Sequence, residues 1–339
     1  MSKFSNLASK HFFSVFLAFF VTILWSSSWP IIKFGMKEIP PLIFAGLRYV
    51  IASFILLVFV LLRPKYRKEL KNLTKRWWLR LISYGLIFYT ITQGAQFFGL
   101  LYLNAITVSL LLSFTPILVL IFANLVLKER SNFIQLILVL LAIAGALLYF
   151  LLNPELVAKQ FLIVSGTNQF ILPPQPIVAT SLKVVGLVVV IIGVLANTFS
   201  AIYGRSINQA KEVSTVVITA VSMFVGSIVL LITGLIVEDI PHFSLTSIGY
   251  ILWLSILNTA LAFTIWNFAM QKLKALEISI INNTMLFQIT VLAVIFLGEL
   301  PTAAQWIGLT IVAVVGLILP IIGSRKRKEE HILPLEENL

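Results

Sequence analysis

Ten apolar stretches, each long enough to cross a lipid bilayer, occupy most of the 339 residues of this chain. A bilayer core about 30 Å thick needs roughly 20 apolar residues per helix. Only helices and closed barrels satisfy their backbone polar groups inside lipid, and the short alternating strands of a membrane barrel are absent from the sequence. We therefore predict an all-α integral membrane protein with ten transmembrane helices. The predicted spans are residues 12–32, 42–62, 78–100, 105–127, 132–152, 184–204, 214–237, 248–270, 278–297 and 303–323.

The last five stretches repeat the pattern of the first five at a constant offset of 170 residues. Ser109 recurs as Ser279, for example, and Glu129 recurs as Glu299. Because each half holds five spans and five is odd, the second half must enter the membrane from the side opposite the first. We expect two inverted five-helix repeats with a substrate site at the midplane between them. The predicted repeats are residues 12–152 and 182–323.

The repeats are separated by residues 153–181, a connection much longer than the others. Its Pro173-Pro174-Gln175-Pro176 run is typical of extended, non-helical chain. Both a solvated extracytoplasmic linker and a gating lid fit such a segment. Residues 324–339, which carry both basic and acidic side chains, form the predicted cytoplasmic tail.

The net charge of +12 is distributed as in a membrane protein rather than a nucleic-acid-binding protein. Of the 25 Lys and Arg residues, 20 fall in the termini and loops of one side, four in the loops of the other side, and Arg48 inside a span. Basic loops stay in the cytoplasm. We therefore expect a multi-pass protein of the cell membrane with both termini in the cytoplasm and no nucleic-acid partner. The first span is too long for a signal peptide, and Trp25, Trp29 and Pro30 stand where a cleavage site needs small residues.

Several chemistries are excluded by what the sequence lacks. There is no cysteine, so disulfides, thiolate catalysis and cysteine metal sites are excluded. The three histidines, His11, His242 and His331, fall in or beside predicted loops, and we expect neither a metal site nor a cofactor. A GxxxxGK(S/T) nucleotide-binding loop and a GxSxG nucleophile turn are absent as well. The chain is therefore not expected to be an enzyme or, by itself, an ATP-driven pump.

Polar and aromatic side chains inside the spans form the candidate substrate site. Polar groups facing lipid are costly, so these side chains are expected to face the interior of the bundle. Amides joined to aromatic walls suit an amphipathic solute. Interhelical hydrogen bonds, worth about 0.6 kcal/mol each, are the alternative explanation, and we favour it for Ser27 and Thr259. The candidate substrate-binding residues are Trp25, Trp29, Arg48, Gln93, Gln96, Asn197, Asn258, Trp266, Asn267 and Asn282.

Arg48 is the one basic residue deep inside a predicted span. An isolated guanidinium at that depth costs at least about 2.5 kcal/mol, so it needs partners. No Asp or Glu stands at a matching depth in another span. Two interpretations remain open. Arg48 is either a scaffold residue bonded to backbone carbonyls and cavity water, or a bidentate anchor for a substrate carboxylate or phosphate.

Acidic residues stand near the ends of the predicted spans rather than at their centres. Glu129 and Glu277 lie on the predicted cytoplasmic side, and Glu299 lies on the outer side. Proton-coupled carriers normally place a titratable group in the transport pathway. Proton antiport, exchange and downhill export therefore all remain compatible with the sequence, and the oligomeric state stays open.

Motifs in both halves resemble a known family. The runs Trp25-Ser26-Ser27-Ser28-Trp29-Pro30 and Ala45-Gly46-Leu47-Arg48-Tyr49 resemble the opening of the EamA-type domain of the drug/metabolite transporter superfamily. The second half is similar to later helices of that family in Asn258-Thr259-Ala260-Leu261-Ala262-Phe263 and Trp266-Asn267-Phe268-Ala269. The resemblance covers about residues 15–322. It implies a ten-helix carrier with a central cavity, alternately open to either side, that exports small organic solutes such as amino acids. An organic-anion or phosphate-ester exchanger is the runner-up, and a non-transporting sensor or scaffold with the same fold is the alternative outside the transporter class.

Overall fold

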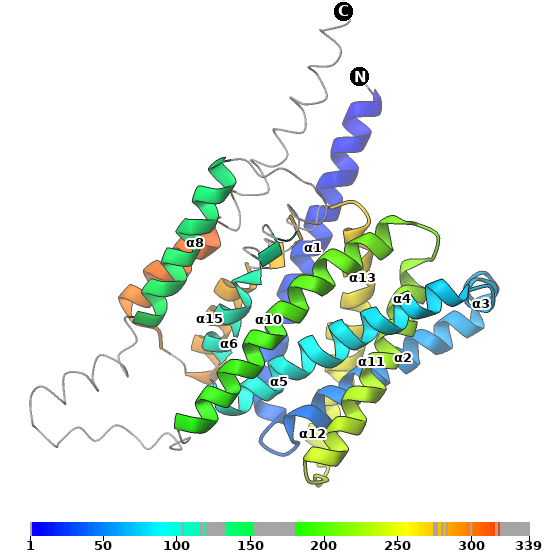
Figure 1. The fold of residues 1–339 in the computed structure, drawn as a ribbon. Helices are drawn as coiled ribbons and strands as arrows, with labels where there is room; N and C mark the ends of the chain where they lie inside the picture. The colour runs from blue at the N-terminus through cyan, green and yellow to red at the C-terminus, as the bar shows by residue number, and fades with distance from the viewer. Residues whose placement is uncertain are drawn as a thin grey trace, which may run out of the picture.

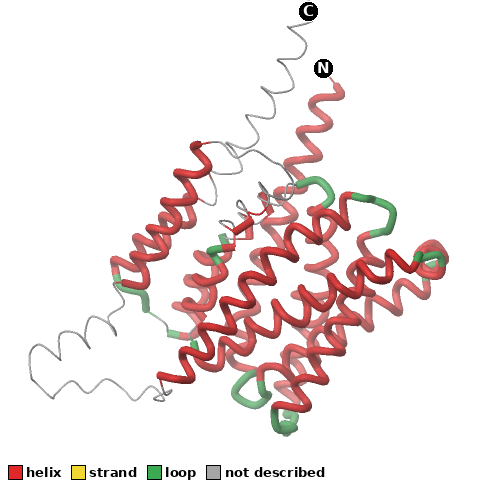
Figure 2. The backbone as a smooth tube through the Cα atoms, viewed as in Figure 1, coloured by secondary structure: helices red, strands yellow, loops and turns green. Residues whose placement is uncertain are grey.

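Figure 1 shows the chain as a bundle of helices, and Figure 2 shows no strand in the part of the chain that the structure describes. The structure is a computed structural model. It describes residues 2–103, 105–115, 118–119, 122, 133–151, 180–273, 277–278, 281–282, 284–298, 300–315 and 318. The predicted tail, nearly all of the predicted linker, and Glu129, Ser279 and Glu299 lie outside these residues. The predicted all-α class is confirmed for the residues described.

Five helices are long and apolar enough to cross a membrane. They are His11–Gly35, Pro41–Leu62, Ser181–Gln209, Thr215–Val237 and Leu245–Met270. The total of ten spans stays a prediction, because several of the others fall partly outside the described residues. A further apolar helix is found at Ala303–Val315.

The labelled elements are α1 (Ser2–Gly35), α2 (Pro41–Leu62), α3 (Pro64–Lys71), α4 (Lys75–Gly85), η1 (Leu86–Thr92), α5 (Gln93–Tyr102), α6 (Ala105–Leu112), α8 (Phe133–Leu151), α10 (Thr180–Gln209), α11 (Thr215–Val237), α12 (Leu245–Ser255), η2 (Ile256–Leu261), α13 (Ala262–Met270) and α15 (Met285–Leu297).

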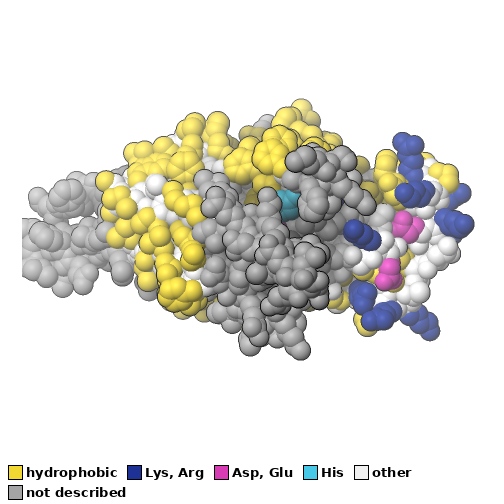
Figure 3. All heavy atoms as spheres, turned by 90° about the horizontal axis from the view of Figure 1, so that it is seen from above, with side chains coloured by type: hydrophobic (Ala, Val, Ile, Leu, Met, Phe, Trp, Pro, Cys, Tyr) yellow, Lys and Arg dark blue, Asp and Glu magenta, His cyan; other side chains and the backbone are white. Residues whose placement is uncertain are grey.

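The basic segment after the second span is more ordered than a plain loop. Its first part forms α3, which begins at Pro64, where the missing N–H of proline costs no helical hydrogen bond. The third span then begins at Lys75 rather than at residue 78, because Thr74 caps α4 by accepting a hydrogen bond from the Trp77 backbone N–H at 3.3 Å. Figure 3 shows Lys and Arg side chains gathered over the end of the molecule formed by α3, while hydrophobic side chains cover much of the remaining described surface in this view.

The third helix of each repeat contains a π-helical segment at an equivalent position. Segment η1 interrupts the helix from α4 to α5, and η2 interrupts the helix from α12 to α13. The segments begin at Leu86 and Ile256, which are 170 residues apart. In each region a threonine hydroxyl donates to the carbonyl five residues earlier, Thr92 at 3.0 Å and Thr259 at 2.7 Å. The internal repeat thus extends to an irregularity of the backbone, of a kind often found at functional sites.

The second helices of the two repeats, α2 and α11, run antiparallel in close contact. A Cβ on Gly46 would lie 2.6 Å from the Cα of Leu231, so the two backbones approach more closely than side chains normally allow. At one end, the Glu238 carboxylate that follows α11 accepts hydrogen bonds from the first backbone N–H groups of α2, at 3.0 and 2.9 Å. At the other end, Glu69 in α3 accepts a hydrogen bond from the Ser214 N–H just before α11. Each of these helix starts is therefore bonded by a glutamate from the segment that follows the other helix.

Candidate substrate cavity

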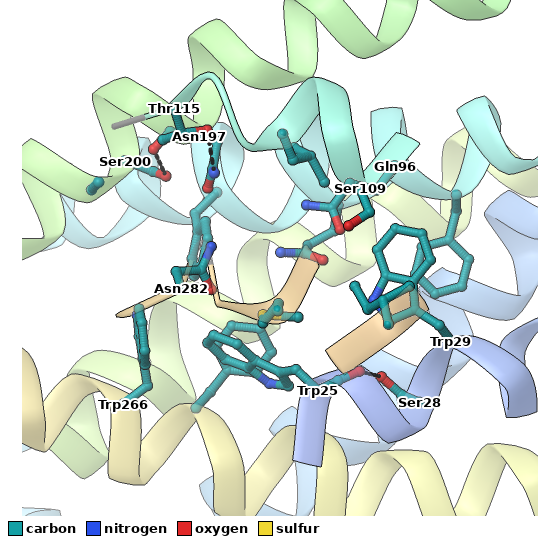
Figure 4. Close-up of a pocket in the computed structure, with 18 of the residues that line it drawn as sticks. Trp25, Ser28, Trp29, Gln96, Ser109, Thr115, Asn197, Ser200, Trp266 and Asn282 are labelled. Carbon is teal, nitrogen blue, oxygen red and sulfur yellow. Dashed lines mark hydrogen bonds between the residues drawn. The ribbon is translucent and has the colours of Figure 1, made fainter. Parts of the chain in front are cut away.

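A cavity with about 110 Å³ of space for water-sized molecules opens between helices of both repeats (Figure 4). Its wall is formed by side chains from α1, α2, α4, η1, α5, α6, α10, α13 and α15. Eight of the ten candidate residues line it, namely Trp25, Trp29, Arg48, Gln93, Gln96, Asn197, Trp266 and Asn282.

The other two candidates, Asn258 and Asn267, are not among the residues lining the cavity. Both are buried between helices. The Asn258 amide donates to Ser27 Oγ of α1 at 3.1 Å. The Asn267 amide donates to Thr219 Oγ1 of α11 at 2.6 Å and accepts from Asn208 Nδ2 of α10 at 3.1 Å. These two amides therefore hold neighbouring helices together, the role that the sequence left open as the alternative.

Three amides in the cavity wall have donors or acceptors that make no hydrogen bond to any described residue. Tyr49 donates its hydroxyl to Gln93 Oε1 at 2.7 Å, which leaves Gln93 Nε2 without a partner in the described part of the chain. Gln96 and Asn282 are half-buried, and their side chains make no hydrogen bond to any described residue. A solute in the cavity is therefore offered donors by all three residues and acceptors by Gln96 and Asn282.

Arg48 borders the cavity while it is bonded to the second repeat. It is 3% exposed, and its Nε donates to Thr259 Oγ1 at 2.7 Å while Nη2 donates to the Asn258 carbonyl at 3.2 Å. Within the described residues, Nη1 makes no hydrogen bond and no carboxylate pairs with the guanidinium. A backbone carbonyl is thus one of its partners, as a scaffold role requires. The nitrogen Nη1, which has no described partner, leaves Arg48 able to bind an anion in the cavity.

Aromatic rings form another part of the wall. The ring of Trp25 lies 4.8 Å from that of Trp266 and 4.7 Å from that of Phe263, between centroids. Phe263 in turn contacts Tyr49 at 6.0 Å and Phe88 at 5.5 Å. These tilted and edge-on contacts are the favourable geometries for aromatic pairs. They make a rigid apolar surface inside the bundle.

Sequence reasoning missed several lining residues, and Phe263 is one of them. An apolar side chain in an apolar span carries no local signal that separates cavity wall from lipid contact or core. The internal repeat does carry such a signal, because Phe263 stands 170 residues after Gln93. Thr115 was missed as well, and it accepts a hydrogen bond from Asn197 Nδ2 at 3.2 Å at the edge of the cavity.

A helical bundle of membrane-spanning length, with a polar and aromatic cavity formed by two repeats, is the architecture of a multi-pass membrane transporter. The family comparison agrees. The EamA-like transporter family matches residues 12–151 and again residues 180–321, and the chain belongs to this family.

Two relatives have names that describe them as transporters. The uncharacterized transporter YoaV of Bacillus subtilis (strain 168) is 24% identical over 309 residues, which cover 89% of this chain and 92% of that protein. A Salmonella typhimurium protein named a probable amino-acid metabolite efflux pump is 24% identical over 331 residues, which cover 94% of this chain and 97% of that protein. One solved crystal structure has the same fold, with a TM-score of 0.68 and 16% identity over 92% of this chain and 98% of that chain.

Proposed function

We propose that this transporter exports small amphipathic metabolites, amino acids foremost, by alternating access through the cavity. The observation that carries the proposal is the cavity wall, in which a partly unpaired guanidinium, free amides and indole rings lie together. Such a wall offers hydrogen bonds to a polar head and apolar surface to a side chain. The residues assigned to substrate binding are Trp25, Trp29, Arg48, Gln93, Gln96, Asn197, Trp266 and Asn282.

Two points support amino acids as the first substrates to test. The Salmonella typhimurium relative is named as an efflux pump for amino-acid metabolites, although it is 24% identical. The cavity also combines one cation with several neutral hydrogen-bonding groups, which suits a carboxylate attached to a neutral or weakly charged body.

The test is transport by the purified protein in liposomes. Proteoliposomes loaded with unlabelled amino acids should take up labelled amino acid by counterflow, and protein-free liposomes should not. Gln96→Ala should weaken apparent affinity several-fold, because a hydrogen bond to a bound solute is worth about 0.5–1.5 kcal/mol. The exposed amide Asn72, at the end of α3, provides the matched control, and Asn72→Ala should transport normally. Binding of amino acids without any counterflow would assign the chain to the sensor or scaffold class instead.

The organic-anion or phosphate-ester exchanger remains the second candidate because of Arg48. This residue is the one charged side chain among the described residues of the wall. A phosphate ester carries close to two negative charges at neutral pH, so a single cation is a weak match for it. Counterflow of a sugar phosphate in the same liposomes, exceeding that of every amino acid, would make this the preferred function.

A further inference from the structure

The two repeats line the cavity at equivalent positions. Ten of the lining residues form five pairs whose members are 170 residues apart, which is the offset of the internal repeat. The same faces of the third and fourth helices of each repeat therefore bound the cavity. The pairs are Gln93 with Phe263, Gln96 with Trp266, Leu100 with Met270, Leu112 with Asn282, and Thr115 with Met285.

The chemistry at these equivalent positions differs between the repeats. In three of the five pairs a polar side chain of the first repeat corresponds to an apolar one of the second. Leu112 and Asn282 reverse this order, and Asn197 of α10 is a further lining amide of the second repeat. Figure 4 shows Gln96 on one side of the cavity and Trp266 on the opposite side, next to Trp25. We call Gln93 and Gln96 the amide wall, and Trp25, Phe263 and Trp266 the indole wall.

The two walls treat a charged head group differently. At the amide wall a carboxylate meets the free donors of Gln93 and Gln96. Tyr49, the residue after Arg48 in α2, donates its hydroxyl to Gln93 and so orients that amide. At the indole wall the rings of Trp25, Phe263 and Trp266 pack against one another. A head group placed against these rings loses its water and finds only indole N–H groups as donors on them. An apolar side chain has the opposite preference, because it leaves water most favourably against the rings.

We infer that the cavity holds its substrate in one orientation, with a carboxylate-bearing head on the amide wall and a single apolar side chain on the indole wall. Gln96 and Trp266, at equivalent positions of the two repeats, determine specificity for the head and for the side chain respectively. The inference rests on the proposed function for its choice of ligand class. The inference concerns binding selectivity rather than turnover, so it can be refuted without refuting the proposed function, and the reverse is also true.

The test compares three ligands on purified protein by isothermal titration calorimetry. Leucine has both a carboxylate and an apolar side chain, alanine keeps the head but has a short side chain, and isopentylamine keeps the side chain but lacks the carboxylate. In Trp266→Ala, the preference for leucine over alanine should fall about tenfold, while the preference for leucine over isopentylamine is unchanged. In Gln96→Ala, the preference for leucine over isopentylamine should fall several-fold, while the preference over alanine is unchanged. Asn72→Ala should alter neither ratio.

The outcomes separate cleanly. Losses of both preferences in both variants, unchanged preferences in both, or no binding of any of the three ligands would each overturn the inference. If the buried Trp266→Ala variant does not fold, Trp266→Phe keeps the packing and should show the same selective loss on a smaller scale. Selective binding without counterflow would refute the proposed function and leave the inference standing, whereas counterflow without selectivity would do the reverse.

Discussion

The guanidinium of Arg48 both bonds the second repeat and borders the cavity. Two of its nitrogens bond the second repeat, at Thr259 and at the Asn258 carbonyl, and so tie α2 to η2. The remaining donors border the cavity without a described partner. A buried charge persists at low cost only when its hydrogen bonds are satisfied. A carboxylate that enters the cavity would complete the set.

We predict that Arg48→Lys weakens leucine binding at least several-fold but leaves isopentylamine binding nearly unchanged. Lysine keeps the charge but lacks the planar fork that matches a carboxylate. Calorimetry with the two ligands measures the difference. The control is Thr259→Val, which removes the hydroxyl that Arg48 bonds and should lower thermal stability without changing the preference between the ligands. Equal losses for both ligands in Arg48→Lys would assign the residue to the scaffold alone.

Among the described residues, α2 and α11 form the most extensive contact between the repeats. Gly46 faces the backbone of Leu231, and a Cβ on Gly234 would lie 2.8 Å from the Ile43 nitrogen. Glu238 bonds the first N–H groups of α2 with both carboxylate oxygens. Partial burial raises the pKa of Glu238, and the two backbone hydrogen bonds oppose that shift. These two hydrogen bonds are the contacts that a substitution of Glu238 would remove.

We predict that Glu238→Ala lowers the free energy of unfolding of the purified protein by roughly 1 kcal/mol, since it leaves two N–H groups at the start of α2 without a hydrogen bond. Glu238→Gln should be milder, because the amide keeps one acceptor oxygen and avoids the cost of a partly buried charge. The matched control is the exposed neighbour Asp239, whose change to alanine should have little effect. A thermal unfolding series in one detergent gives the order, and a Gln variant less stable than the Ala variant would contradict this account.

At the scale of the whole molecule, the asymmetry of basic loops predicts one orientation in the membrane. Both termini and the basic segment around α3 should be cytoplasmic, and the linker of residues 153–181 should be outside. Because the chain has no cysteine, single cysteines can be introduced without background. A membrane-impermeant maleimide should label Thr167→Cys in intact cells and Ser324→Cys only after permeabilisation. The reverse pattern would invert the predicted topology.

We also predict that transport depends weakly on a proton gradient. No Asp or Glu stands among the described residues that line the cavity. Glu277 is buried, and His11 lies 3.6 Å from it, so its carboxylate is already engaged at the end of the bundle near the start of α1. Counterflow should persist at equal pH on both sides and in Glu277→Gln. A strict requirement for a pH difference, lost in that variant while folding is intact, would show proton coupling.

The sequence carries a local signal for polar residues that avoid lipid. Gln93, Gln96 and Asn282 were placed in a cavity because uncharged polar groups inside a span avoid lipid, and all three line it. The same rule selected Asn258 and Asn267, yet the structure bonds both of them to neighbouring helices. An amide in a span has two ways to avoid lipid, and which one it takes depends on what the adjacent helix presents.

The sequence by itself determined that the chain is helical, spans a membrane and repeats at 170 residues, because span length and hydrophobicity are set along one segment at a time. Only the tertiary structure decided that α2 and α11 are in backbone contact, that Arg48 is bonded to η2, and that Asn267 is bonded to α10 and α11. Each of these depends on residues far apart in the chain that meet through packing, which no single span records.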